Sequence, residues 1–342
     1  MINKTKETIE NELKQMWEIN FLDNREFIDL FFDYFYNDEN VFYSQQNGEI
    51  ISCLYLLPFF MNFLNTKVKT SYLCGATTYI DYRQKGQMKI IIERALNNLY
   101  ENDVAFCALS PANGKLFEYY KKLGFFTSYY NKKITISQER EIIKNNITFK
   151  ESKDALFFSK IYSQVYYQQE LSISRDKKTF EFLIKDYGIA KNTKVLKIFN
   201  NFVPCGYLFY KIENGQGIIT EFCFKDVSYF EFKNAVLEYF CVDEIKAIVP
   251  SYFSQEKGKN YKIGMIRIVN LYKVLCLFAN NNPDLEIVFS VKDELILQNN
   301  GSYKISDGIV SKTNEKSDKI LDINDISSII FNRNGYINLL LI

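Results

Sequence analysis

Residues 75–88 read GATTYIDYRQKGQM, a strand end, a turn and a helix start within one stretch. The run 70–78 is typical of a β-strand, and the apolar spacing after the turn predicts a helix over 88–100. The first turn of a helix has unbonded N–H groups and the positive end of the helix dipole, so it attracts anions. Arg83 and Lys85 add positive charge, which makes a pyrophosphate the natural ligand. The alternative is an ordinary capped helix with two solvated basic residues.

Elements of an α/β fold lie on both sides of this stretch. Upstream, the pair Asn47-Gly48 joins two strand-like runs and predicts a hairpin. Downstream, 104–109 predicts a buried strand, and 113–123 predicts a helix that ends at Gly124. Strand, glycine loop, helix, strand and helix in this order predict an α/β (α+β) domain with a mixed sheet.

Two further blocks follow along the chain. The block 147–250 repeats the order of elements but has no glycine loop, and the polar run 254–264 is typical of a linker. In the last block we expect, among other elements, a strand over 295–298. We therefore expect three domains, formed by residues 1–146, 147–258 and 259–342.

Composition excludes several kinds of chemistry. The chain has 342 residues, with 42 basic and 41 acidic side chains and no histidine. The missing histidine excludes a Ser-His-Asp or Cys-His nucleophile and a His-ligated metal, and we expect no metal site. The balanced charge argues against a nucleic-acid ligand.

The cysteines and the apolar runs indicate where in the cell the protein is located. The seven cysteines form no C-x-x-C pair and most lie in apolar runs, so we expect free, buried thiols in a reduced compartment. The N-terminus is polar, unlike a signal peptide, and the apolar run 50–64 is broken by Pro58 and too short to span a bilayer. We expect a cytoplasmic protein with no membrane span.

Two motifs resemble those of the GNAT acetyltransferases. Residues 83–88, RQKGQM, resemble motif A (Q/R-x-x-G-x-G/A), with Met88 in place of the last small residue. Residues 119–125, YYKKLGF, resemble motif B, which ends Y-x-x-x-G-F. The wider run YLCGATT at 72–78 is similar to the enhanced-intracellular-survival (Eis-like) branch. The motifs stand in the order and spacing of that family.

The resemblance implies acetyl-CoA as the acyl donor. In the family, the strand before the glycine loop splays from its neighbour, its backbone pairs with the pantetheine arm, and one N–H stabilises the oxyanion. The expected cofactor-binding residues are Ala76, Thr77, Thr78, Arg83, Gln84, Lys85, Gly86, Gln87, Met88 and Asn113.

The resemblance also implies a direct attack by a free amine, with Tyr120 as the general acid. A phenol can donate to a departing thiolate. The alternative for Tyr120 is packing, because it follows Leu116 by four residues and Phe117 by three on the predicted helix.

The residues that bind the acceptor are expected near the start of the chain, and the general base is expected at its end. Phe21 and Asp23 match an F-x-D element of the Eis-like acceptor pocket, and an acidic, aromatic pocket suits a cationic amine. In that family the terminal carboxylate reaches the active site, which here makes Ile342 the expected base. The alternative is that the apolar end of the chain is a terminal strand.

The resemblance extends over nearly the whole chain. It implies a degenerate second GNAT-like domain, a shortened sterol-carrier-protein-like domain that contains 265–271 and 291–301, and a homo-oligomer built as a trimer or hexamer. The acceptor stays open between an aminoglycoside, a polyamine, a peptide lysine and another small amine. A non-catalytic protein that binds acyl-CoA, an apolar ligand or a partner and a Fem-type aminoacyl transferase are the competing functions.

Overall fold

The computed structural model describes residues 5–138, 146–315, 317, 319–331 and 335–337. The chain divides into two compact units: Met1–Ser128 with Gly264–Arg333, and Tyr129–Ile263 with Asn334–Ile342. Each unit combines a mixed sheet with helices, which confirms the predicted α/β fold class. The division into three domains stays a prediction.

The sheet of the first unit begins with three antiparallel strands, β1 (Val41–Gln46), β2 (Glu49–Phe63) and β3 (Thr66–Thr78). Strand β4 (Phe106–Leu109) runs parallel to β3, and the end of β11 (Gly258–Ile268) pairs antiparallel with β4. The predicted hairpin is confirmed, because β1 and β2 meet at Asn47 and Gly48, whose φ angles are 53° and 85°.

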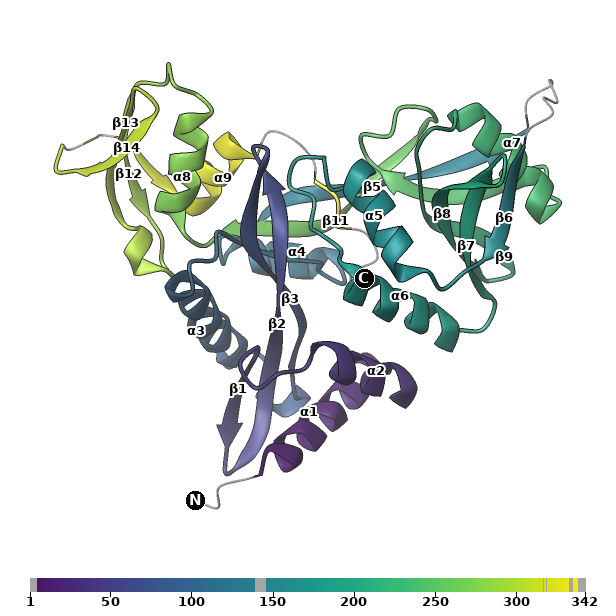
Figure 1. The fold of residues 1–342 in the computed structure, drawn as a ribbon. Helices are drawn as coiled ribbons and strands as arrows, with labels where there is room; N and C mark the ends of the chain where they lie inside the picture. The colour runs from purple at the N-terminus through teal and green to yellow at the C-terminus, as the bar shows by residue number, and fades with distance from the viewer. Residues whose placement is uncertain (1–4, 139–145, 316, 318, 332–334, 338–342) are drawn as a thin grey trace. The chain divides into compact units, whose positions relative to one another are not determined.

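Helices cover both faces of this sheet because β2 is apolar on both of its faces. Leu54 and Leu56 pack in one cluster with α3 (Gln87–Glu101) and α4 (Gly114–Lys121). Tyr55, which points the other way, lies 5.4 Å from the ring of Trp17. Trp17 belongs to α1 (Lys6–Phe21), which packs beside α2 (Arg25–Phe35). Figure 1 shows α3 on one side of the β2–β3 hairpin and α1 with α2 on the other.

The C-terminal part of the first unit has its own small sheet, in the order β14-β13-β12-β15. Its elements are α8 (Leu271–Asn280), β12 (Ile287–Lys292), the 3₁₀ turn η2 (Leu297–Asn299), β13 (Gly301–Ser306), β14 (Ile309–Thr313), β15 (Ile320–Asp322) and α9 (Ile323–Ile330). The strand expected at 295–298 is wrong. Asp293 Oδ1 accepts the N–H groups of Leu295 and Ile296, which removes these donors from any ladder.

The second unit repeats the order of the first: two helices, three antiparallel strands, a helix and a strand parallel to the third. Its sheet has the order β5-β10-β9-β8-β7-β6. The elements are β5 (Phe126–Ser137), β6 (Ile147–Glu151), α5 (Ala155–Val165), α6 (Lys177–Ile189), β7 (Thr193–Asn200), β8 (Val203–Glu213), β9 (Gln216–Phe224), α7 (Tyr229–Phe240) and β10 (Glu244–Pro250).

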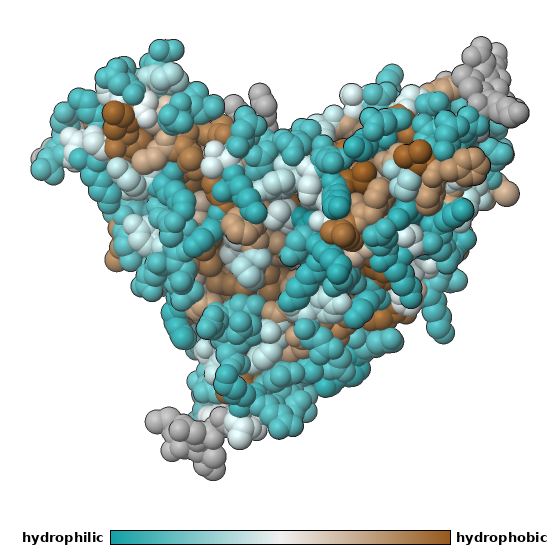
Figure 2. Space-filling model, viewed as in Figure 1, coloured by the Kyte–Doolittle hydropathy of each residue, from teal (hydrophilic) through white to brown (hydrophobic). Residues whose placement is uncertain are grey.

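Hydrophilic side chains cover most of the face seen in Figure 2. Within the described ranges, no helix has both the length and the apolar character that a bilayer crossing requires.

Candidate active site

The pairing of β3 changes near its end on both sides. Its ladder with β4 ends at the pair Leu73–Leu109, so in the described structure 74–78 continues without a β4 partner. On the β2 side the register shifts at a bulge that contains Gly75, whose φ is +57°. A Cβ at Gly75 would lie 2.7 Å from both Trp17 and Tyr55, so only glycine fits there. The strand therefore ends in a backbone edge that β4 leaves open.

The loop after this strand leads directly into the start of α3. A 3₁₀ turn, η1 (Ile80–Tyr82), comes first, and the chain then passes through Gln84 and Gly86 with φ angles of 60° and 78°. No side chain caps α3 at Gly86, and its first turn contains no acidic residue. A Cβ on Gly86 would meet no atom within 4 Å, so the space in front of the helix is open. Its first N–H groups are available to an anion.

The two cations of the loop have different surroundings. Arg83 Nε donates to the carbonyl of Thr78 at 2.9 Å, and its Nη2 donates to Asn20 Oδ1 at 2.8 Å. Lys85 Nζ lies 5.5 Å from the centre of the Tyr82 ring. Arg83 therefore ties the loop to the end of β3 and to α1, while Lys85 stays exposed beside the helix start.

The remaining predicted cofactor residues divide between loop, strand and helix. Gln84 is exposed, Gln87 opens α3, and Thr77 and Thr78 are buried at the end of β3. Met88 packs against the cluster formed by α3 and α4, which explains why a long apolar side chain stands there. Asn113 caps α4 by accepting the N–H of Leu116 at 3.2 Å.

Tyr120 lies on α4 and is only 7% exposed. Its ring contacts Tyr119 and Phe125, with centroids 5.2 Å and 5.6 Å away. Burial raises the pKa of the Tyr120 phenol, and the neighbouring Tyr119 and Cys107 raise it further. Its hydroxyl makes no hydrogen bond within the described part of the chain. Tyr120 thus packs in the core and still carries a proton that a ligand could accept.

The residues expected at the acceptor site are connected to the β3 bulge through Trp17. Trp17 Nε1 donates to Asp23 Oδ2 at 2.8 Å, and the Phe21 ring lies 5.3 Å from the indole. The same indole lies over Gly75. Sequence reasoning did not identify this role of Trp17, although a lone glycine inside a strand is a signal for close packing.

Ile342 lies outside the described residues, so its assignment as the base stays a prediction. The last described segment, residues 335–337, belongs to the second unit. There the Tyr336 hydroxyl donates to Glu221 Oε2 at 2.5 Å, and the buried guanidinium of Arg175 donates to both Glu221 oxygens at 2.8 and 3.0 Å. The sequence patterns did not identify this buried cluster.

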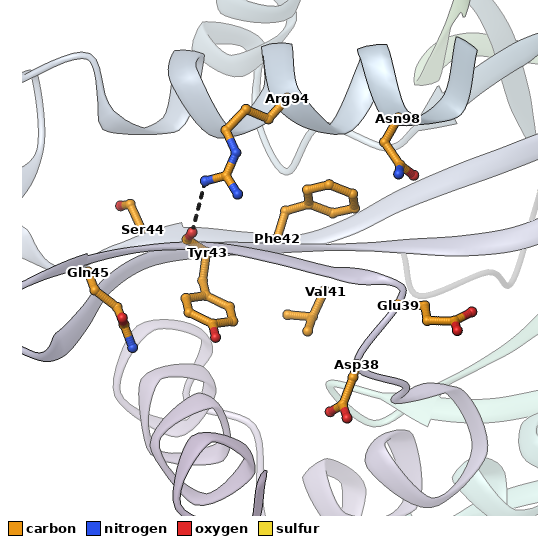
Figure 3. A pocket seen from close by; sticks show the side chains of 9 residues that line it. All are labelled: Asp38, Glu39, Val41, Phe42, Tyr43, Ser44, Gln45, Arg94 and Asn98. Atoms are coloured by element: carbon orange, nitrogen blue, oxygen red, sulfur yellow. Dashed lines mark hydrogen bonds between the residues drawn. The ribbon is translucent and has the colours of Figure 1, made fainter. Parts of the chain in front are cut away.

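A cavity of about 670 Å³ lies beside the edge strand β1 (Figure 3). Arg94 of α3 points toward β1 and donates to the carbonyl of Tyr43 at 3.4 Å, while Asp38 and Glu39 lie at the other end. Its lining, taken over the described residues, includes none of the predicted site residues. No group of three or more acidic, cysteine or histidine side chains in the described ranges could hold a metal ion.

The second unit has no equivalent of the open helix start. Helix α7 occupies the place that α3 has in the first unit, but Ser228 caps it. The Ser228 Oγ accepts the N–H of Glu231, and Glu231 Oε2 in turn accepts the N–H of Ser228 at 3.0 Å. A helix start that is already capped and carries its own carboxylate is a poor site for a phosphate.

Solved structures share this fold over nearly the whole chain. A conserved protein of unknown function from Enterococcus faecalis V583, titled a probable N-acyltransferase, aligns with a TM-score of 0.77 at 16% identity. A GCN5-related N-acetyltransferase from Anabaena variabilis ATCC 29413 gives 0.76 at 18%, and Eis1 from Mycobacterium abscessus gives 0.72 at 12%. Each alignment covers 96% of this chain and 88% of the other. At such identities the likeness concerns the fold.

The family itself is indicated by the N-terminal part of the sequence. Residues 1–127 match the family described as acetyltransferase (GNAT) domain. The matched part of the chain holds the glycine loop, Tyr120 and Trp17. No curated protein matches the chain significantly.

Proposed function

We propose that the protein is an acetyl-CoA-dependent N-acetyltransferase that transfers acetyl directly to a primary amine. The start of α3 is the observation that carries this proposal. It combines an uncapped helix N-terminus, a glycine with open space in front of it, and the cations Arg83 and Lys85. The equivalent helix of the second unit is capped by its own side chains, so the first unit is the one suited to bind coenzyme A.

The end of β3 suits the arm of coenzyme A. Residues 74–78 lack a β4 partner, so their backbone can pair with the amides of the pantetheine as another strand would. An N–H of Ala76, Thr77 or Thr78 would face the thioester carbonyl and stabilise negative charge on its oxygen. The bulge at Gly75 lies just beyond the last pair with β4, whereas Thr77 and Thr78 stay paired with β2.

Tyr120 would supply a proton to the sulfur that leaves. Because burial raises its pKa, the phenol stays protonated at neutral pH and can donate to the thiolate. The amine that attacks loses one proton as the amide forms, and this proton restores the phenol. No protein nucleophile is needed.

The terminal carboxylate of Ile342 is the base in this proposal: it accepts a first proton from the incoming ammonium group, so that the free amine attacks and its second proton restores the phenol. Extending the chain by a few glycine and serine residues would move that carboxylate without altering any side chain. Turnover and acceptor KM that both survive the extension would mean that another group accepts the proton.

The acceptor side is proposed to include Phe21 and Asp23. Asp23 Oδ2 accepts from Trp17, and Oδ1 accepts no hydrogen bond from a described residue. A carboxylate oxygen beside aromatic rings suits an ammonium group. Aminoglycosides, polyamines, lysine side chains and other small amines share that group.

The proposal also includes the Eis-like type, a sterol-carrier-like C-terminal part, a cytoplasmic location and assembly into an oligomer. We expect a homo-oligomer built from trimers. Sedimentation that gives a monomer at micromolar concentration would contradict this expectation.

Thiol release from acetyl-CoA with a panel of amines tests the function. The panel contains one aminoglycoside, one polyamine, one lysine peptide and one small metabolite amine, and calorimetry measures coenzyme A binding in parallel. Release with any of them supports the proposal. Tight coenzyme A binding without release would favour a non-catalytic binding protein, and no binding would overturn the assignment of the loop.

A further inference from the structure

Arg267 and Asp293 form a buried ion pair in the first unit. Arg267 Nη2 donates to Asp293 Oδ1 at 2.6 Å, and both side chains are 1% exposed. The same oxygen accepts the N–H groups of Leu295 and Ile296 at 3.0 and 3.2 Å. These two residues belong to the core cluster that includes Tyr120. The ion pair therefore orders part of the core around the candidate acid.

The guanidinium also lies against the turn that follows Tyr120. A Cβ at Gly124, whose φ is +81°, would lie 1.9 Å from Arg267 Nη1, so a larger residue would have to displace the guanidinium. Gly124 belongs to the turn that closes α4. In this turn Leu123 and Phe125 donate their N–H groups to the Tyr120 carbonyl at 2.9 and 3.1 Å.

Strand pairing places the Arg267 side chain on the face that carries α4. Arg267 stands directly opposite Cys107 in the β4–β11 ladder, and directly opposite residues point to the same face. Cys107 belongs to the same core cluster as Tyr120. Asn324 also holds the end of α4, because its Nδ2 donates to the Lys121 carbonyl at 3.0 Å.

Arg267 is an unusual residue for a buried position in the core. Its Nε and Nη1 are buried and make no hydrogen bond in the described part of the chain. An apolar pair of similar volume would often be at least as stable as a buried ion pair. The guanidinium differs from an apolar side chain because it places a rigid, planar group against Gly124.

We propose that Arg267, held by Asp293, is a positioning residue for Tyr120. The guanidinium fixes the turn at Gly124, and this turn fixes the last turn of α4 and the direction of the Tyr120 hydroxyl. The inference rests on the proposed role of Tyr120 in acetyl transfer.

The first test is Arg267→Lys, which keeps the charge and can still pair with Asp293 but removes the planar fork. We expect unchanged coenzyme A affinity and acceptor KM, and a kcat about tenfold lower or more, typical of a misplaced acid. In a Tyr120→Phe background the same change should have no further effect on kcat, because the hydroxyl that it positions is gone. If Arg267→Lys does not fold, the double variant Arg267→Gln with Asp293→Asn takes its place in the same comparison of kcat. It removes both charges together.

Lys273→Ala is the matched control. It removes the exposed ion pair with Asp103, which also connects the C-terminal part of the first unit to its N-terminal part. We expect it to leave kcat unchanged in both backgrounds. A similar fall of kcat for Arg267→Lys in both backgrounds would show a general structural effect and overturn the inference. Full kcat in Tyr120→Phe alone would instead overturn the role of Tyr120.

A fluorine label gives a readout that does not depend on turnover. With 3-fluorotyrosine at position 120, we expect Arg267→Lys to shift or broaden the ¹⁹F resonance and Lys273→Ala to leave it in place. A resonance that Arg267→Lys does not change would overturn the inference, even if no acceptor amine has been found.

Discussion

Gly86 and Gly48 share a backbone conformation but differ in what they face. Their φ angles are 78° and 85°, and a Cβ on either would meet no atom within 4 Å. We expect Gly86→Asp to weaken coenzyme A binding by about 3 kcal/mol or more, because it brings a carboxylate to the pyrophosphate. Gly48→Asp introduces the same strain in the β1–β2 hairpin and should leave the affinity intact. Equal affinities of both folded variants by calorimetry would refute the assignment of the loop.

Tyr120 and Tyr119 are adjacent tyrosines on α4 that allow a matched comparison. Burial raises the pKa of both phenols. We expect Tyr120→Phe to lower kcat by about a hundredfold, as for a positioned acid, with coenzyme A affinity nearly unchanged. Tyr119→Phe should keep kcat within about twofold of the parent. An unchanged kcat in Tyr120→Phe, with chemistry shown to limit the rate, would leave Tyr120 only a packing role.

For single residues, the sequence predicts the position of those that stand in short local motifs. The glycine loop and Tyr120 stand in short motifs, so their positions on a helix start and a helix could be inferred. The partners of Arg83 could not, because Asn20 lies 63 positions away along the chain. The contact of Trp17 with Gly75 depends in the same way on how α1 packs.

The bulge in β3 leaves no room for a side chain at Gly75. Gly75→Ala would place a Cβ 2.7 Å from Trp17 and Tyr55 at a φ of +57°. We expect a loss of about 2–5 kcal/mol in the free energy of unfolding, since overpacking adds to backbone strain. Gly48→Ala has the strain alone and should lose about 1 kcal/mol. Denaturant titration of the two variants makes the comparison, and equal losses would show that the close packing at the bulge contributes nothing.

Elements with strong local signals were predictable, and those defined by distant contacts were not. The Asn47-Gly48 hairpin and the helix before Gly124 follow from turn chemistry. The segment 295–298 resembles a strand in composition, but Asp293 captures its N–H groups. Such a side-chain bond has no periodic signature in the sequence.

Buried thiols and phenols make the free energy of unfolding depend on pH in the alkaline range. Burial raises the pKa of Cys53 and Cys107 to about 12 and raises the pKa of Tyr55 and Tyr72. In the unfolded chain these groups lose their protons near pH 8.5 and 10. Between those values and the raised pKa values the folded state holds more protons, so stability falls as pH rises.

We expect the urea midpoint to fall progressively above about pH 8.5 in the presence of a reductant. Cys107→Ala should make the decline shallower. Cys241→Ala removes an exposed thiol and should not change it. A midpoint that stays constant up to pH 10.5 would contradict the prediction.

The pairing of β4 with β11 also bears on how the protein is made. β4 ends at residue 109, but its partner residues 265–268 come far later in the chain. At about 5–20 residues per second, a ribosome that has finished residue 128 needs roughly 7–28 s to add the next 140 residues, up to 268. During that interval one edge of β4 is without its native neighbour, and an open apolar edge invites pairing with other chains. Rapid synthesis through the second half of the message would therefore protect the nascent N-terminal part of the first unit.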